Sequence, residues 1–139
     1  MLEVLHPSPS SFPGSALERN NNSLVFRLVY RDLSFLLTGD IEAEAERYLA
    51  QTSSSLASSV LKVAHHGSKT STTAAFLQQA NPTLAVISAG VDNRFGHPHP
   101  DVVARLEQAV GEGRIYRTSE QGNIQFISDG HSLWVKTQR

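Results

Sequence analysis

The stretch Ser34-Phe35-Leu36-Leu37-Thr38-Gly39-Asp40 decides the fold of this chain. A short apolar run that ends at a glycine predicts a buried β-strand, and the acid-rich residues 41–50 that follow have helical spacing. Asp40 should therefore lie where a strand passes into a helix, at the rim of a sheet, where ligands collect in layered α/β proteins. A simpler alternative is that Asp40 caps this helix by accepting hydrogen bonds from its first turn.

The composition describes one globular domain without a special class of partner. The 139 residues, of which 40% are hydrophobic and 18% charged, suffice for one hydrophobic core. A formal net charge of −1 gives no basic surface for tight nucleic-acid binding. Because the chain has no cysteine, disulfides, zinc-thiolate sites and thiol catalysis are excluded. No apolar run reaches the length of a membrane span, so we expect a soluble chain.

The pattern of apolar residues predicts a mixed α/β fold. Short apolar or alternating runs predict strands over residues 1–5, 23–30, 33–38, 60–64, 83–88, 114–117, 122–127 and 132–136. Helical spacing predicts helices over residues 41–50, 69–80 and 101–110. This order of elements favours a mixed β-sheet with helices on one face.

Two details of the helices and one loop complete this prediction. In the helix over residues 41–50, the apolar face lies opposite a charged face that includes Glu42 and Glu46. Asp101 is expected to cap the helix over residues 101–110. Residues 7–22 are rich in Ser, Pro, Gly and Asn, which predicts a loop.

Histidines gather at the predicted strand ends. His65 and His66 directly follow the strand over residues 60–64, and His97 and His99 lie in the loop after the next strand. Imidazole and carboxylate ligands at neighbouring strand ends suit Zn²⁺, Mn²⁺ or Fe²⁺. A single histidine of this kind is more often a surface or capping residue, but clusters at corresponding strand ends together with Asp40 favour a metal site.

Four segments of the chain carry a family resemblance. NNNSLVFRL, FLLTGD, LKVAHHGSKTS and AVISAGVDNRFGHPHPDV closely resemble the C-terminal metallo-β-lactamase-fold domain of the ComEC DNA-internalisation competence proteins. The resemblance covers residues 4–130. It implies that residues 1–139 form a single α/β domain, the C-terminal half of a metallo-β-lactamase αββα sandwich. It also implies a soluble domain of a bacterial inner-membrane protein that takes part in DNA uptake during natural transformation.

The resemblance also implies roles for individual residues in a metal-dependent nuclease or phosphodiesterase. Asp40 corresponds to the carboxylate that bridges two metals, and the last histidine ligand is His65, which directly follows the strand, or His66. Asn93 and His97 match the loop expected to face the substrate phosphate and to act in catalysis. Ser68, which could bond a phosphate oxygen or His65, and Asn22 are expected among the substrate-binding residues.

One family motif is missing. The pattern H-x-(H/D)-x-D-H, which supplies most ligands of the first metal, does not occur in the sequence. We therefore expect the chain to bind Zn²⁺ or Mn²⁺ weakly or not at all, and to be inactive alone. The expected partners are the upstream half of the same domain, the membrane channel region, DNA through the parent protein, and a second copy of the fragment.

Two other interpretations of the same residues stay open. The chain could belong to another hydrolase of the same fold, such as a phosphodiesterase, a phosphorylcholine esterase or a lactonase, because fold alone does not determine function. It could also be a non-catalytic binding module, in which the histidines take no part in chemistry.

Overall fold

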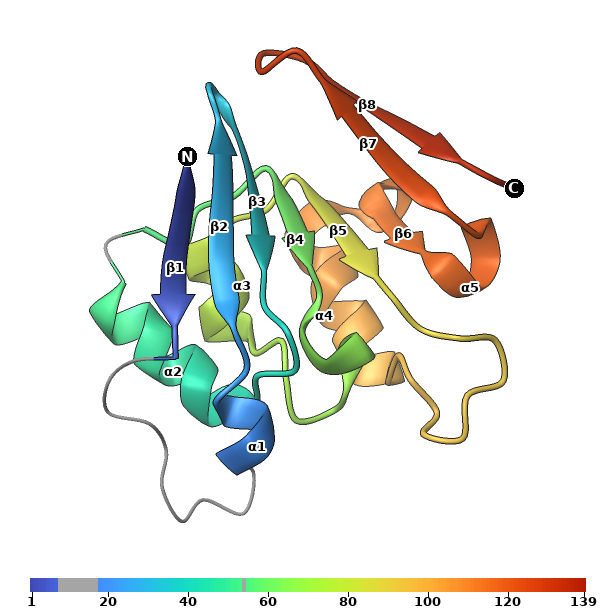
Figure 1. Cartoon of the computed structure of the whole chain (residues 1–139). Helices are drawn as coiled ribbons and strands as arrows, with labels where there is room; N and C mark the ends of the chain where they lie inside the picture. The colour runs from blue at the N-terminus through green and yellow to red at the C-terminus, as the bar shows by residue number, and fades with distance from the viewer. Residues whose placement is uncertain (8–17, 54) are drawn as a thin grey trace.

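A single mixed sheet organises the computed structural model, which describes residues 1–7, 18–53 and 55–139 (Figure 1). Its six strands follow one another in chain order: β1 (Leu2–His6), β2 (Val25–Tyr30), β3 (Leu33–Leu37), β4 (Val60–Lys62), β5 (Leu84–Ile87) and β6 (Ile115–Arg117). The first three strands pair antiparallel, whereas β3 to β6 pair parallel. A separate antiparallel hairpin is formed by β7 (Ile124–Ser128) and β8 (Leu133–Thr137).

Three helices cover one face of the sheet: α2 (Ala43–Thr52), α3 (Ala74–Ala80) and α4 (Pro100–Val110) (Figure 1). Their apolar faces meet the strands in one core, to which the sheet contributes Leu36, Leu61 and Ile87 and the helices contribute Leu49, Phe76 and Leu106. The shorter elements are α1 (Glu18–Asn21), α5 (Thr118–Gln121) and two 3₁₀ turns, Ala64–Gly67 and Glu112–Arg114. The prediction of a mixed sheet with helices on one face is confirmed.

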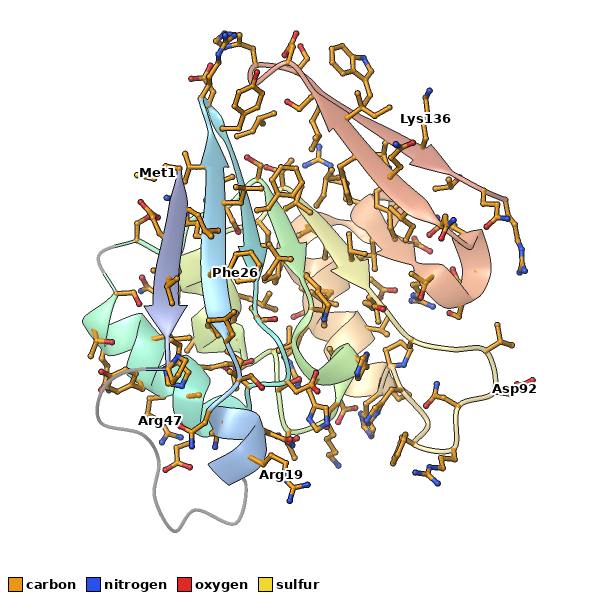
Figure 2. The ribbon with its side chains drawn as sticks, in the orientation of Figure 1. Met1, Arg19, Phe26, Arg47, Asp92 and Lys136 are labelled. Carbon is orange, nitrogen blue, oxygen red and sulfur yellow. The ribbon has the colours of Figure 1, made fainter. Side chains whose placement is uncertain are left out.

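The other face of the sheet is largely open. Side chains alternate across a strand, so Leu36 is fully buried under the helices while its neighbours Phe35 and Leu37 lie on the second face. The hairpin β7–β8 packs there through Phe126, whose ring centroid lies 5.7 Å from that of Phe35. Beside this contact is an open groove of about 660 Å³, lined largely by apolar side chains from β2 to β5 and β7. Figure 2 shows the side chains of the whole structure in the orientation of Figure 1.

Several local predictions were wrong. The helix expected over residues 69–80 begins at Ala74, because the Thr73 hydroxyl accepts a hydrogen bond from the backbone N–H of Phe76 (3.3 Å) and caps it. The N-cap of α4 is His99, whose Nδ1 accepts from the backbone N–H of Asp101 (3.2 Å), and Asp101 does not have this role.

The loop prediction for residues 7–22 was also incomplete. Residues 8–17 lie outside the described part of the chain, and Glu18–Asn21 is helical. Glu42 and Glu46 are buried, against the prediction of a charged face, and the reason lies in their partners, described below. Within the described residues, no helix combines the length and the apolarity that a bilayer crossing needs.

Candidate metal and phosphate site

Asp40 lies at the rim of the sheet, just beyond the end of β3. The turn before it depends on Gly39, whose φ is +56° and where a Cβ would come within 2.8 Å of the Cβ of Ser23. The backbone N–H of Asp40 donates to the Ser23 hydroxyl (3.2 Å), which fixes the residue in place. Glu42, and not Asp40, occupies the N-cap position of α2, so the capping interpretation of Asp40 was wrong.

The turn after β4 separates its two histidines. His65 and His66 both have left-handed backbone conformations, with φ of 46° and 56°. Such conformations cost non-glycine residues roughly 1–3 kcal/mol each and are found preferentially at functional sites. The backbone N–H of His65 donates to the carbonyl of Gly39 (3.1 Å), so the ends of β3 and β4 are tied together. As a result, the two imidazoles contact different carboxylates.

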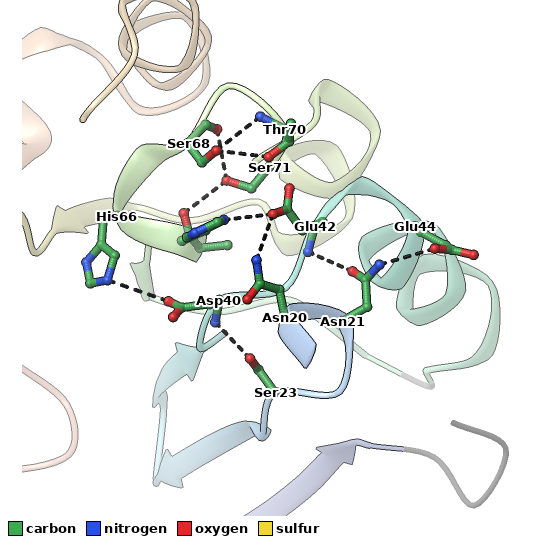
Figure 3. Close-up of polar contacts among 12 residues, drawn as sticks. Asn20, Asn21, Ser23, Asp40, Glu42, Glu44, His66, Ser68, Thr70 and Ser71 are labelled. Carbon is green, nitrogen blue, oxygen red and sulfur yellow. Dashed lines mark hydrogen bonds and ion pairs between the residues drawn. The ribbon is translucent and has the colours of Figure 1, made fainter. Parts of the chain in front are cut away.

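His66 is the imidazole beside Asp40 (Figure 3). Its Nε2 lies 3.7 Å from Oδ1 of Asp40, and both side chains are nearly half exposed. Its Nδ1 lies 2.5 Å from the carbonyl oxygen of Ser88. Because a carbonyl can only accept a hydrogen bond, Nδ1 carries a proton, so in the neutral form of the ring the lone pair is on Nε2.

His65 instead contacts Glu42, which the sequence pattern had not indicated as a site residue. Its Nδ1 lies 2.8 Å from Oε1 of Glu42, whose side chain is only 3% exposed. Asn20 donates to the same oxygen (3.1 Å), and the side-chain oxygen of Asn21 accepts from the backbone N–H of Glu42 (3.0 Å) (Figure 3). These contacts explain how a carboxylate is accommodated in the protein interior.

The loop between β5 and α4 brings His97 to the same rim. The side-chain amide of Asn93 donates to the carbonyls of Gly90 (3.0 Å) and His97 (2.6 Å), and its oxygen accepts from the His97 N–H (2.9 Å). Asn93 therefore shapes this loop from within. The His97 ring centroid lies 5.8 Å from that of His65, and burial, reinforced by His65 and His66, lowers the pKa of His97 below its ordinary value.

A second loop contact depends on glycine. At Gly67, whose φ is +81°, a Cβ would come within 2.7 Å of the Cβ of Pro98. The Gly67 carbonyl accepts from the His99 N–H (2.8 Å). The loop after β5 can therefore lie directly on the turn after β4. An open cavity of about 450 Å³ results, and its lining includes His66, Phe95 and His97.

Ser68 and Asn22 are the residues expected from the sequence to bind substrate. The Ser68 hydroxyl is buried and bonds to the hydroxyl of Thr70 (2.9 Å), within the turn that leads to α3. Asn22 follows α1 and is half-buried. Lys62, at the end of β4, was not singled out from the sequence; burial lowers its pKa, and the charge of Asp40 acts in the opposite direction.

The site residues fit a metal ion in part. Zinc binds histidine nitrogen and carboxylate oxygen at about 2.0–2.2 Å, so ligand atoms 3.7 Å apart can reach the same ion. Asp40 and His66 meet this condition, whereas Oε1 of Glu42 and Nδ1 of His65 are in direct contact and leave no space for an ion between them. In residues 1–7, 18–53 and 55–139, no three His, Asp or Glu side chains are grouped closely enough to hold a metal.

Comparison with known proteins found related sequences but no matching family model. Over 120 residues, the chain is 41% identical to ComE operon protein 3 of Bacillus subtilis, covering 86% of this chain and 14% of that protein. It is 38% identical over 110 residues to Recombination protein 2 of Haemophilus influenzae, covering 79% of this chain and 14% of that protein. It is 36% identical over 126 residues to Competence protein ComA of Neisseria gonorrhoeae, covering 90% of this chain and 17% of that protein.

Proposed function

Because the chain is homologous to a short region of ComE operon protein 3, Recombination protein 2 and Competence protein ComA, we propose that it is part of a ComEC-type competence protein that takes up DNA in natural transformation. The observation that carries this proposal is 36–41% identity over most of the chain. The chain spans only about a sixth or a seventh of the length of these relatives. We accordingly place it as a soluble domain of a larger bacterial inner-membrane protein, whose channel region and DNA are its partners.

The chemistry proposed for the parent domain is metal-dependent hydrolysis of a phosphodiester bond. A bound Zn²⁺ or Mn²⁺ would supply a hydroxide nucleophile and stabilise negative charge on the phosphoryl oxygens. Asp40 and His66 are the residues of this chain that would hold the metal, since the Asp40 carboxylate and the His66 Nε2 lone pair lie together. His65 is the alternative ligand and would act through its Nε2, because its Nδ1 faces Glu42.

His97 is the proposed phosphate-facing group. A pKa below the ordinary histidine value keeps its ring neutral at pH 7, so it can donate a hydrogen bond to a phosphoryl oxygen without a fixed charge. Asn93 acts on this step through the loop that it shapes, because its amide bonds hold the backbone of His97. Ser68 and Asn22 are assigned to the surrounding substrate surface.

Further metal ligands would come from the rest of the parent protein. Two ligands from this chain leave most of a metal's coordination to water, so we expect weak metal binding and no useful nuclease activity from the chain alone. The open face of the sheet gives a second reason to expect contact with the rest of the parent protein. Exposed apolar side chains there, such as Leu28 (42% exposed) and Tyr30 (46% exposed), are suited to packing against the upstream half of the domain, or against a second copy when the chain is isolated.

The test is DNA uptake and nuclease activity of the parent protein carrying Asp40→Ala or His66→Ala. The matched control is Asp32→Ala, which removes an exposed acid at the far end of the β2–β3 hairpin. We expect the two site variants to lose nuclease activity and the control to keep it. If the unaltered parent protein takes up DNA at the normal level but has no nuclease activity, the result would favour a non-catalytic binding module.

Light scattering on the isolated chain tests the open face. We expect self-association that Leu28→Lys abolishes, because a charge within the apolar face opposes its burial. A chain that is monomeric at every concentration would contradict the proposal for this surface. The proposal for the metal site is tested separately, by the uptake and nuclease assays.

A further inference from the structure

We propose that Glu42 is a positioning residue for His65: it holds the proton of this imidazole on Nδ1, so that Nε2 is presented as a lone pair in the candidate site. The functional role of this oriented imidazole rests on the proposed function, because His65 would be a second oriented imidazole in the site of Asp40 and His66. Its physical content, a carboxylate that sets the tautomer of a histidine, is independent of any bound metal.

The first argument is the contact itself. Nδ1 of His65 lies 2.8 Å from Oε1 of Glu42, and an ionised carboxylate at this distance can only accept a hydrogen bond from the ring. Within the described residues, buried Nδ1 of His65 and buried Oε2 of Glu42 lack a hydrogen bond of standard geometry. A small rotation of the ring that aligns Nδ1–H with Oε1 of Glu42 would satisfy Nδ1.

The second argument is that Glu42 is held in place independently of His65. Asn20 donates to its Oε1, and Asn21 binds its backbone N–H. Asn21 is in turn fully buried, and its carbonyl contacts Nε2 of His6 at 2.6 Å. This network joins β1, α1 and the start of α2, so the carboxylate has a fixed position toward which His65 is oriented.

The third argument is the parallel with His66. Its Nδ1 proton is held by the carbonyl of Ser88, which leaves Nε2 toward Asp40. With Glu42 in the same role for His65, both imidazoles after β4 carry the proton on Nδ1. Carboxylates and carbonyls that fix histidine tautomers in this way commonly increase the metal affinity or activity of a site by about 10–100-fold. The left-handed backbone of both residues directs the two rings to their separate acceptors.

The experiment is long-range ¹H–¹⁵N NMR of the metal-free 139-residue chain at a pH roughly two units above the ordinary histidine pKa. We expect Nδ1–H for both His65 and His66 in the unaltered chain. In Glu42→Ala, His65 should change to Nε2–H, the tautomer that imidazole favours in water, while His66 should not change. Nε2–H at His65 in the unaltered chain, or an unchanged His65 in Glu42→Ala, would overturn the proposal.

The matched control is Glu46→Gln, which also replaces a buried carboxylate of the α2 region but one that bonds to Thr72 and Thr73. It should leave the tautomers of both histidines unchanged. If Glu42→Ala does not fold, Glu42→Gln serves in its place: a fall in the Nδ1–H fraction of His65 relative to the unaltered chain supports the proposal, and an unchanged fraction contradicts it.

A zinc titration of the same variants separates this inference from the proposed function. We expect Glu42→Ala to weaken zinc binding by about 10–100-fold and Glu46→Gln to leave it unchanged. If the unaltered chain binds no zinc, its two proposed ligands do not hold the ion without the rest of the parent protein. The tautomer measurement still decides the role of Glu42.

Discussion

The two faces of the sheet are built by the same strands but are covered very differently. On the helix-covered face, Leu36, Leu61 and Ile87 are fully buried. On the other face, Leu28 and Tyr30 remain 42% and 46% exposed, and the β7–β8 hairpin covers only part of the surface (Figure 1). The difference indicates that the covered face supplies the stability of the fold, whereas the open face retains apolar surface for another partner. The candidate site lies at the strand ends, where loops from the covered side meet this rim.

The largest expected effect compares two leucines of β3. Leu36 is fully buried on the covered face and Leu37 is half-buried on the open face. Leu36→Ala should lower the free energy of unfolding by about 2–5 kcal/mol, because a buried cavity remains. Leu37→Ala should cost about 1 kcal/mol, in proportion to the smaller apolar area that it buries. Urea denaturation measures both, and equal losses would contradict the difference between the faces.

The same comparison shows which parts of the fold can be predicted from sequence. Strands β2 and β3 follow from alternation and from apolar runs of strand length, because their burial is periodic in the sequence. The alternation of apolar residues does not indicate which segment or protein packs against each face of the sheet. Phe35 and Leu37 have the pattern of buried residues, yet they are only partly covered in this chain.

A second effect probes the covered face through Glu46, which is fully buried and accepts hydrogen bonds from the backbone N–H groups of Thr72 and, at 2.8 Å, Thr73. Glu46→Ala should cost about 1–3 kcal/mol, because buried donors lose their acceptor. Glu107→Ala on the exposed face of α4 is the control and should change stability by less than about 0.5 kcal/mol.

The cost of Glu46→Ala should depend on pH. Burial raises the pKa of Glu46 above 4.5. Its hydrogen bonds with Thr72 and Thr73 and the charge of Arg105 act in the opposite direction but have the smaller effect. The raised value means that the folded state binds a proton more tightly than the unfolded state. The resulting stabilisation is present below pH 4.5 and is lost as the pH rises through the folded pKa. The free-energy difference between wild type and variant should therefore shrink over that window, and a growing difference would contradict the assignment.

Glu46 and Glu42 also explain why part of the site could not be predicted. Helical spacing assigns both to a charged face, since the period records only which side of a helix a residue occupies. Their burial depends on the turn after β4 and on α1, which supply Thr72, Thr73 and Asn20 from distant parts of the sequence. The proximity of Asp40 and His66, in contrast, follows from neighbouring parallel strands ending at one rim. Their roles as metal ligands stay predictions.

A third effect concerns the open face at the β7–β8 hairpin. Phe126 contacts Phe35 and Tyr116 through edge-to-face rings, with centroid distances of 5.7 and 6.4 Å. Phe126→Ala should cost about 0.5–1.5 kcal/mol for each lost aromatic pair. Amide hydrogen exchange should become faster in β7 and β8 but not in β3 and β4. Equal acceleration throughout the sheet would show that the hairpin is part of the main cooperative unit.

The smallest effect is expected at the tip of the same hairpin, where His131 joins it to the β2–β3 turn. Nδ1 of His131 lies 2.6 Å from Oδ2 of Asp32, and both side chains are exposed. The hydrogen bond with Asp32, and then its charge, raise the pKa of His131 above 6.5. A raised histidine pKa means that the stabilisation is fully present below pH 6.5 and is lost as the pH rises through the folded value.

Asp32→Asn tests this contact. NMR titration of His131 should give a lower pKa in the variant than in the wild type, with His99, which caps α4, as an internal reference that does not change. Because both partners are exposed and solvent screens the pair, global stability should hardly change. Amide exchange near Asp129 and Ser132 becomes intrinsically faster in both proteins as the pH rises. In the wild type we expect an additional increase, because the contact between His131 and Asp32 is lost over the same pH range. If the two proteins behave alike, the hairpin is held over the open face by Phe126 and not by this ion pair.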